Sequence, residues 1–275
     1  MDIKELTASG FKFKKNLGQN FLTDRNLLKA IACDAGVTSD DTVVEIGTGA
    51  ATLTSVLCET AKNVVTFELD EDLLPCIKNT LSKYDNVTFL FKDVLKLSDE
   101  ELRVWVPEPF KVVANLPYYV TTPMIMRFVE SDLKITSLTL MMQKEVADRL
   151  VAKSGTKDYG SITVSLEAVA DVTVTRTIDR RLFYPSPNVD SALVRIDFNK
   201  EKYSFKNFDL FKKTVKAGFL MRRKTLVNNL TAYFSLPKST AEKIVTDLGF
   251  SPTVRGETLA CSDYIRLSDA LSAIL

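Results

Sequence analysis

The first two-thirds of the chain alternate short β-branched, apolar runs with segments of helical periodicity, and this rhythm restricts the fold more than any other feature. Strands joined by helical crossovers pair in parallel, and helices cover both faces of a parallel sheet. We expect strands at 42–46, 63–69, 87–93, 111–115 and 137–143, with helices at 52–60, 71–83, 121–131 and 144–153. A preceding helix, capped by Thr23 or Asp24, should end at Gly36. The sequence therefore predicts an α/β fold whose ligands bind at the carboxyl ends of the strands.

The pattern changes after residue 160. A helical stretch at 161–170 is followed by two apolar runs, 172–178 and 183–198, which are expected to close the sheet as a hairpin. From about Lys202 the apolar residues recur only with helical spacing. We therefore predict two domains, 1–202 and a small all-helical domain at 203–275.

Composition excludes several kinds of chemistry. The 275 residues contain no histidine, which rules out Ser-His-Asp and Cys-His catalysis and removes the commonest metal ligand. The four cysteines are scattered without a C-x-x-C pair, so we expect no metal site, no disulfides and a cytoplasmic location. No apolar run approaches the roughly 18 residues that a membrane span needs, and the charged start of the sequence lacks a secretory apolar core.

The net charge of +1 conceals an uneven distribution. Between Arg176 and Lys224 there are thirteen Lys or Arg and only five Asp or Glu, and the N-terminal segment adds Lys12, Lys14 and Lys15. Such segregation favours a polyanionic partner; the alternative is an ordinary surface of solvated lysines.

The stretch 43-VVEIGTGAATLT-54 is a strand, a turn with Gly47 and Gly49, and a helix start. Glycines at such a turn let the backbone approach a ligand closely. Glu68 ends the next strand, where a carboxylate can accept both hydrogen bonds of a ribose diol. This spacing also fits a nicotinamide dinucleotide, although Thr52 stands where that fingerprint has its third glycine. Asp93 ends the third strand, and the alternative for both acids is a polar strand end without a ligand.

The fourth strand ends on Asn115, Leu116, Pro117 and Tyr118, an order that folding alone does not require. An adenine exocyclic amine is a poor nucleophile because its lone pair is delocalised into the ring. The Asn115 side-chain oxygen and the Leu116 carbonyl can accept its two hydrogens and draw the lone pair back to nitrogen. Pro117 would fix the turn, and Tyr118 would stack on a flipped base. The alternative is a simple strand-to-helix turn.

These residues together resemble the rRNA adenine dimethyltransferases that modify the small ribosomal subunit. The resemblance runs nearly end to end: 16-NLGQNFL-22, 45-EIGTG-49, 67-FELD-70, 115-NLPYYVTTP-123, 142-MQKEVADRL-150, 183-FYPSPNVDSALVRI-196, 222-RRKTLVNNL-230 and 255-RGETL-259. It implies a Rossmann-like, seven-stranded methyltransferase fold with S-adenosylmethionine as methyl donor. One departure is Tyr119, where many relatives carry Asn.

The resemblance also implies roles for individual residues. Asn20, Leu22, Gly47 and Gly49 would line the cofactor pocket, with Gly47 at the amino-acid end of the cofactor. Glu68 would bind the ribose, and Asp93 would bind the cofactor adenine. Asn115 would bridge the cofactor and the target amine, and Tyr118 and Phe183 would stack on either side of the target base. The implied substrate is a pair of adjacent adenines in a terminal hairpin loop of 16S rRNA within the immature small subunit. In that family each of the two adenines receives two methyl groups. We expect the protein to act as a monomer.

Basic residues of the second half are the expected RNA contacts: Lys212, Lys216, Arg222, Arg223, Lys224, Arg180 and Arg181. Lys212, Lys216 and Arg223 share one face if a single helix carries all three. Two other functions stay open. The related large-subunit methyltransferases of the erythromycin-resistance type favour Ile where this chain has Leu116, and a ribosome-assembly factor could bind RNA without turnover.

Overall fold

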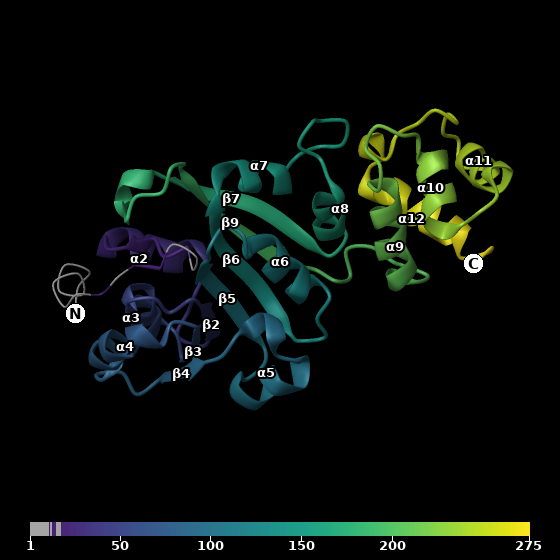
Figure 1. The fold of residues 1–275 in the computed structure, drawn as a ribbon. Coiled ribbons are helices and arrows are strands. Elements are labelled where there is room, and N and C mark those ends of the chain that lie inside the picture. The colour runs from purple at the N-terminus through teal and green to yellow at the C-terminus, as the bar shows by residue number, and fades with distance from the viewer. Residues whose placement is uncertain (1–10, 12, 15–17) are drawn as a thin grey trace. The chain divides into compact units, whose positions relative to one another are not determined.

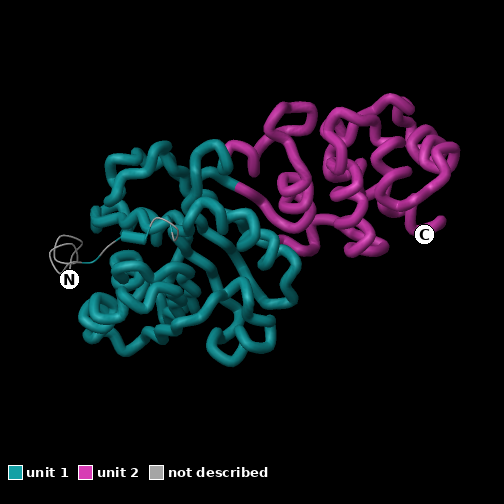
Figure 2. The backbone as a smooth tube through the Cα atoms, viewed as in Figure 1, with its two compact units in different colours: residues 1–147, 173–198 teal, residues 148–172, 199–275 magenta. Residues whose placement is uncertain are grey.

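The computed structural model describes residues 11, 13–14 and 18–275. Lys12, Lys15 and the first two residues of the quoted motif at 16–22 lie outside the described residues. The chain forms two compact units, residues 1–147 with 173–198 and residues 148–172 with 199–275 (Figure 2). The predicted domain boundary at 202 lies near residue 198, where the chain passes from the first unit to the second for the last time. Residues 148–172, which the sequence pattern assigned to the first domain, group instead with the C-terminal helices.

A seven-stranded sheet forms the centre of the first unit, with helices on both sides (Figure 1). Its strands are β2 (Thr42–Ile46), β3 (Asn63–Glu68), β4 (Val87–Phe91), β5 (Phe110–Asn115), β6 (Ile135–Gln143), β7 (Ala170–Ile178) and β9 (Ser191–Phe198). The order is β4-β3-β2-β5-β6-β9-β7; the first five are parallel, and β9 is antiparallel to β6. The five expected parallel strands are confirmed, and the expected closing hairpin corresponds to the neighbours β7 and β9.

The parallel register decides which side chains share a face of the sheet. Glu45 of β2 lies beside Thr66 of β3 and Val113 of β5. Apolar residues of the same face, including Val43 and Val64, form a buried cluster with α2 (Arg25–Asp34) and α3 (Thr52–Thr60). The Glu45 carboxyl is therefore held in an otherwise apolar layer between sheet and helix.

The remaining helices of the first unit follow the strands in order: a short 3-10 turn η2 (Glu71–Leu73), α4 (Leu74–Leu81), the 3-10 turn η3 (Val94–Lys96), α5 (Asp99–Trp105) and α6 (Thr121–Val129). Helix α7 (Lys144–Leu150) begins in the first unit and ends in the second. Helix α5 was not predicted. Ser98 and Glu101 form its capping box, in which each side chain accepts a hydrogen bond from the other residue's backbone. An ion pair of 2.6 Å between Asp99 and Arg127 joins α5 to α6.

The second unit is helical: α8 (Ser161–Glu167), α9 (Phe208–Gly218), α10 (Leu226–Phe234), α11 (Lys238–Asp247), the 3-10 turn η5 (Gly256–Thr258) and α12 (Cys261–Leu271). Helix α8 contacts α9 and α12, which explains why it groups with them. Phe211, Val215, Leu230 and Leu267 are buried, as the helical spacing of the apolar residues predicted, and Tyr264 is buried with them.

Helix α9 ends before the basic residues at 222–224. The Asn229 side chain donates to the Gly218 carbonyl at 2.9 Å and fixes this end, and Gly218 packs directly on the Tyr264 ring. Lys212 and Lys216 therefore lie on α9, whereas Arg223 lies on the turn that follows. The expectation that all three share one helical face is wrong.

Candidate functional site

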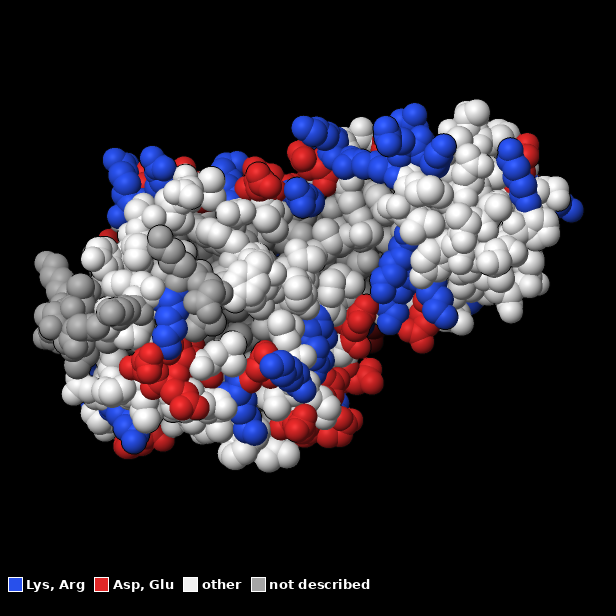
Figure 3. Space-filling model, viewed as in Figure 1, with Lys and Arg blue, Asp and Glu red and all other residues white. Residues whose placement is uncertain are grey.

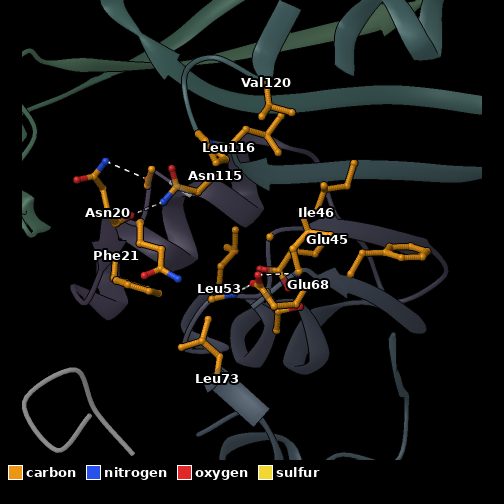
Figure 4. Close-up of a pocket in the computed structure, with 18 of the residues that line it drawn as sticks. Asn20, Phe21, Glu45, Ile46, Leu53, Glu68, Leu73, Asn115, Leu116 and Val120 are labelled. Atoms are coloured by element: carbon orange, nitrogen blue, oxygen red, sulfur yellow. Dashed lines mark hydrogen bonds between the residues drawn. The ribbon is translucent and has the colours of Figure 1, made fainter. Parts of the chain in front are cut away.

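A cavity of about 140 Å³ opens at the carboxyl ends of the parallel strands. The residues after β2, β3, β4 and β5 line it, together with residues 18–22, which we call the N-terminal strap. Of the expected cofactor-site residues, the cavity brings together Asn20, Leu22, Gly47, Gly49, Glu68, Asp93 and Asn115. Figure 4 shows Asn20 and Asn115 on one side of this pocket and Glu45 and Glu68 on another.

The turn after β2 brings the backbone to the edge of the cavity. Gly47 and Gly49 have φ of +84° and +57°, a region that residues with a side chain adopt at a cost. A Cβ on Gly49 would also lie 2.9 Å from the Phe21 ring of the strap. Both glycines are thus required by backbone conformation, and Gly49 also by its close contact with the strap.

The Glu68 carboxylate is fixed by three backbone N–H groups. Gly49 donates to Oε2 at 2.8 Å, and Leu69 and Asp70 donate to Oε1 at 2.7 and 2.9 Å. A carboxylate has about four acceptor positions, so one remains for a ligand. The expected contact between Glu68 and a ribose diol stays a prediction.

Glu45 is a buried acid that sequence reasoning passed over. Its side chain lines the cavity, is 1% exposed, and accepts hydrogen bonds from Thr54 at 2.5 Å and Thr66 at 2.9 Å. Burial raises the pKa of Glu45 to about 8 against the effect of the two hydroxyl donors, and the nearby Glu68 raises it further. A carboxylate within the apolar run 43–46 was the sequence signal for this residue.

The orientation of the Asn115 amide is set by the strap. Its Nδ2 donates to the backbone carbonyl of Asn20 at 2.9 Å, which assigns the other terminal atom as oxygen (Figure 4). Within the described part of the chain, Oδ1 accepts no hydrogen bond. The side-chain oxygen of Asn115 is therefore an oriented acceptor at the cavity, as the proposed chemistry requires.

Long-range contacts hold the strap over the strand ends. The buried Asp70 accepts a hydrogen bond at 2.6 Å from Gln19 of the strap, and another at 2.5 Å from Lys14, which precedes the strap in the chain. On the other side, a Cβ on Gly18 would lie 2.8 Å from the Pro117 ring, so only glycine permits this approach. These contacts, which sequence analysis missed, tie the strap both to the end of β3 and to the turn after β5.

Asp93 and Leu22 also have structural partners. Asp93 lines the cavity and accepts a hydrogen bond from the Leu95 backbone at 3.1 Å, which caps η3. The Leu22 carbonyl accepts a hydrogen bond from Thr52 at 3.0 Å, so the strap is joined to the first turn of α3. Each residue lies at the cavity and also stabilises its own segment.

The two aromatic residues expected to sandwich a target base differ in exposure. Tyr118 is half-buried, its hydroxyl lies 2.9 Å from the Ser191 hydroxyl, and burial raises its pKa. Phe183 is only 4% exposed and packs in the apolar cluster with Leu22. Pairing of the two short strands β1 (Phe21–Leu22) and β8 (Phe183–Tyr184) turns Phe183 inward. Phe183 is thus part of the core in this structure, and its role in the expected sandwich stays a prediction.

Several expected RNA contacts form ion pairs or hydrogen bonds within the protein. Arg181 pairs with Asp179 at 2.5 Å and lowers the pKa of that acid to about 2, and Arg180 donates to the Asn188 carbonyl. Lys212 pairs with Asp209 at 2.8 Å, whereas Lys216 is exposed.

Arg222 also has partners within the protein. It contacts Glu257 and the Lys157 carbonyl. Within the described residues, the Arg223 and Lys224 side chains have no carboxylate partner.

Over the described ranges, no group of His, Cys, Asp or Glu is arranged to hold a metal ion. Over the same ranges, no helix has the length and apolar character needed to cross a membrane. The four cysteines are free thiols.

The order of the seven-stranded sheet and its covering helices are those of a class I methyltransferase fold, with the cavity at the strand ends. Solved structures agree. A dimethyladenosine transferase from Plasmodium falciparum has a TM-score of 0.78 at 25% identity, over 90% of this chain and 95% of its own. The 23S rRNA methyltransferase ErmE has a TM-score of 0.70 at 26% identity, over 92% and 100%.

Sequence comparison narrows the class. The sequence model of the family described as Ribosomal RNA adenine dimethylase matches residues 10–267. Two relatives described as Ribosomal RNA small subunit methyltransferase A are 44% identical (Enterococcus faecalis, 97% of this chain and 92% of the relative) and 45% identical (Geobacillus thermodenitrificans, 98% and 94%). The chain belongs to the ribosomal RNA adenine dimethylase family.

Proposed function

We propose that this protein transfers methyl groups from S-adenosylmethionine to the exocyclic amines of two adjacent adenines in a terminal hairpin loop of 16S rRNA. Family membership and the small-subunit relatives support this substrate. The likeness to the large-subunit enzyme ErmE is lower, at 26% identity against 44–45% for the small-subunit relatives. We place the reaction in the cytoplasm, on the immature small subunit, with the protein acting as a monomer.

The residues at the cavity fit the proposed cofactor. The open backbone at Gly47 and Gly49 suits a polar amino-acid end, and the remaining acceptor position of Glu68 suits one ribose hydroxyl. Asp93, which lines the cavity, would accept a hydrogen bond from the adenine amine of the cofactor, and Leu22 and Asn20 line the cavity from the strap. When bound, S-adenosylmethionine supplies a methyl group on a sulfonium, which is an electrophile that needs no metal.

The observation that carries the proposal is the oriented amide of Asn115. With Nδ2 held by the Asn20 carbonyl, Oδ1 can accept one hydrogen of the target amine, and the Leu116 carbonyl can accept the other. Two acceptors favour the geometry in which the nitrogen lone pair is localised for attack. The protein contributes position and orientation rather than a general base, which agrees with the absence of histidine.

Tyr118 is the aromatic residue that we assign to stacking on the flipped base. Because Phe183 lies in the core, stacking by its ring would require the pair of β1 and β8 to separate. A catalytically inactive assembly factor is disfavoured by the complete set of Glu68, Asp93 and Asn115 at one cavity.

The test is incubation with labelled S-adenosylmethionine and unmethylated small subunits, followed by mapping of the labelled nucleotides. We expect label on two adjacent adenines of one terminal hairpin loop. Binding of the subunit without transfer would favour the assembly-factor alternative, and label on large-subunit RNA alone would favour the erythromycin-resistance type.

A further inference from the structure

A basic surface of the second unit includes residues that the sequence did not single out. The loop between α7 and α8 carries Lys153 and Lys157, both exposed, and the turn between α9 and α10 carries Arg223 and Lys224, also exposed. Figure 3 shows Lys and Arg side chains gathered over this loop and turn. We call these four residues the basic surface.

Hydrogen bonds hold the loop in a defined conformation. The Thr156 backbone and hydroxyl both donate to the Lys153 carbonyl, at 3.2 and 2.6 Å. Gly155 N–H donates to the Glu257 carbonyl at 2.8 Å, and the buried Tyr159 hydroxyl donates to the Leu259 carbonyl at 3.0 Å. The loop is thus attached at two points to the segment around η5.

Arg222 connects the loop to the turn. Its guanidinium donates to the Lys157 carbonyl and, at 3.3 Å, to the Glu257 carboxylate. The backbone carbonyl of the same Glu257 accepts the hydrogen bond from Gly155 N–H. Glu257 therefore contacts both the loop, through Gly155, and the turn, through Arg222. The side chain of Arg222 is used within the protein, although its neighbours Arg223 and Lys224 have no carboxylate partner among the described residues.

The charges around this arrangement are uneven. Glu257 is neutralised by Arg222, which leaves Asp158 as an exposed acid on the loop. Four cations on two joined segments present donors to a phosphate backbone, which carries regularly spaced negative charges.

We propose that Lys153, Lys157, Arg223 and Lys224 contact rRNA phosphates, and that Arg222 is a positioning residue that holds the loop lysines beside the turn. This inference rests on the proposed function, because it takes rRNA as the partner. It separates Arg222 from Arg223, two adjacent arginines that look equivalent in the sequence.

The first test measures binding of an unmethylated 16S rRNA hairpin fragment between 50 and 200 mM salt. Lys153→Gln with Lys157→Gln should make the negative slope of log K against log[salt] shallower by about 1.4–1.8, because each phosphate contact contributes about −0.7 to −0.9 to that slope. The matched control is Lys238→Gln with Lys243→Gln, two exposed lysines of α11 in the same unit. An equal slope for the two double variants would overturn the role of the loop.

The second test separates positioning from contact. In Arg222→Gln, and also in Arg222→Lys, exchange of the Gly155 amide hydrogen should rise at least tenfold while the amides of α9 and α12 keep their protection. Arg223→Gln should leave Gly155 unchanged. RNA affinity lost in Arg222→Gln should not add to that lost in the double lysine variant, because both remove the same contacts. Additive losses, or unchanged exchange at Gly155, would overturn the positioning role.

Methyl transfer by the unmodified protein is measured separately, on unmethylated small subunits. If it transfers methyl groups and the loop variants behave like the control, only this inference fails. If the unmodified protein transfers none, the proposed function fails.

Discussion

Replacing Asn115 with alanine separates the catalytic role of this residue from its structural one. The change removes the 2.9 Å hydrogen bond to the Asn20 carbonyl, a part-buried neutral bond worth about 1 kcal/mol. For a unit of this size, that loss lowers Tm by about 2–4 °C. The change also removes the oriented acceptor Oδ1, and loss of one preorganised hydrogen-bonding group in an active site lowers kcat by about 100- to 1,000-fold.

The assay is the initial rate of labelled methyl transfer to unmethylated small subunits, together with thermal unfolding. Asn79→Ala, an exposed asparagine of α4 in the same unit, is the matched control and should retain full activity. Asn115→Asp should fail as Asn115→Ala does, because an oxygen would then face the Asn20 carbonyl. A kcat of Asn115→Ala within threefold of the unmodified protein would refute the assigned role.

Three further predictions concern other parts of the molecule. Asp70→Asn should weaken cofactor binding roughly tenfold, as measured by calorimetry, because Asp70 holds Gln19 of the strap and the preceding Lys14 through charge-assisted bonds of about 1.5–3 kcal/mol. The control is Asp72→Asn, which should change cofactor binding little, because Asp72 is exposed and pairs only with Lys14 among the described residues. The pKa of Glu45 is about 8 in the folded protein and 4.5 ordinarily, so the free energy of unfolding should fall by several kcal/mol as the pH rises between these values. Glu45→Gln should remove this fall in denaturant titrations at pH 5, 7 and 9. A pH profile of Glu45→Gln equal to that of the unmodified protein would contradict the burial argument. Lys216→Glu should weaken RNA binding more than Lys212→Glu does, because Asp209 already pairs with Lys212; equal losses in filter binding would contradict this.

The strand ends were predictable because local sequence encodes them. Each parallel strand is a short β-branched run, and the polar residues Glu68, Asp93 and Asn115 follow or end three of them. Since carboxyl ends of parallel strands meet at one edge, the cavity followed from the order of elements alone.

Helix α5 was missed because its seven residues hold too little apolar periodicity. The capping box of Ser98 and Glu101 was the available signal.

Other features depend on residues far apart in the chain. Phe183 is buried because its strand β8 pairs with β1, where Leu22 lies opposite, and no sequence pattern near residue 183 predicts this pairing. The contacts of Asp70 with Gln19, and of Arg222 with the Lys157 carbonyl, are of the same kind. Strand spacing placed Glu68, Asp93 and Asn115 at the strand ends, whereas the orientation of Asn115 and the restraint of Arg222 required the three-dimensional arrangement.

A crystal structure of the protein with S-adenosylmethionine bound would show whether Asn115 faces the methyl donor. We expect a Glu68 oxygen within hydrogen-bond distance of the ribose and the Asn115 Oδ1 atom facing the methyl carbon, with Nδ2 still on the Asn20 carbonyl. A turn at 115–118 directed away from that carbon would contradict the role assigned to Asn115.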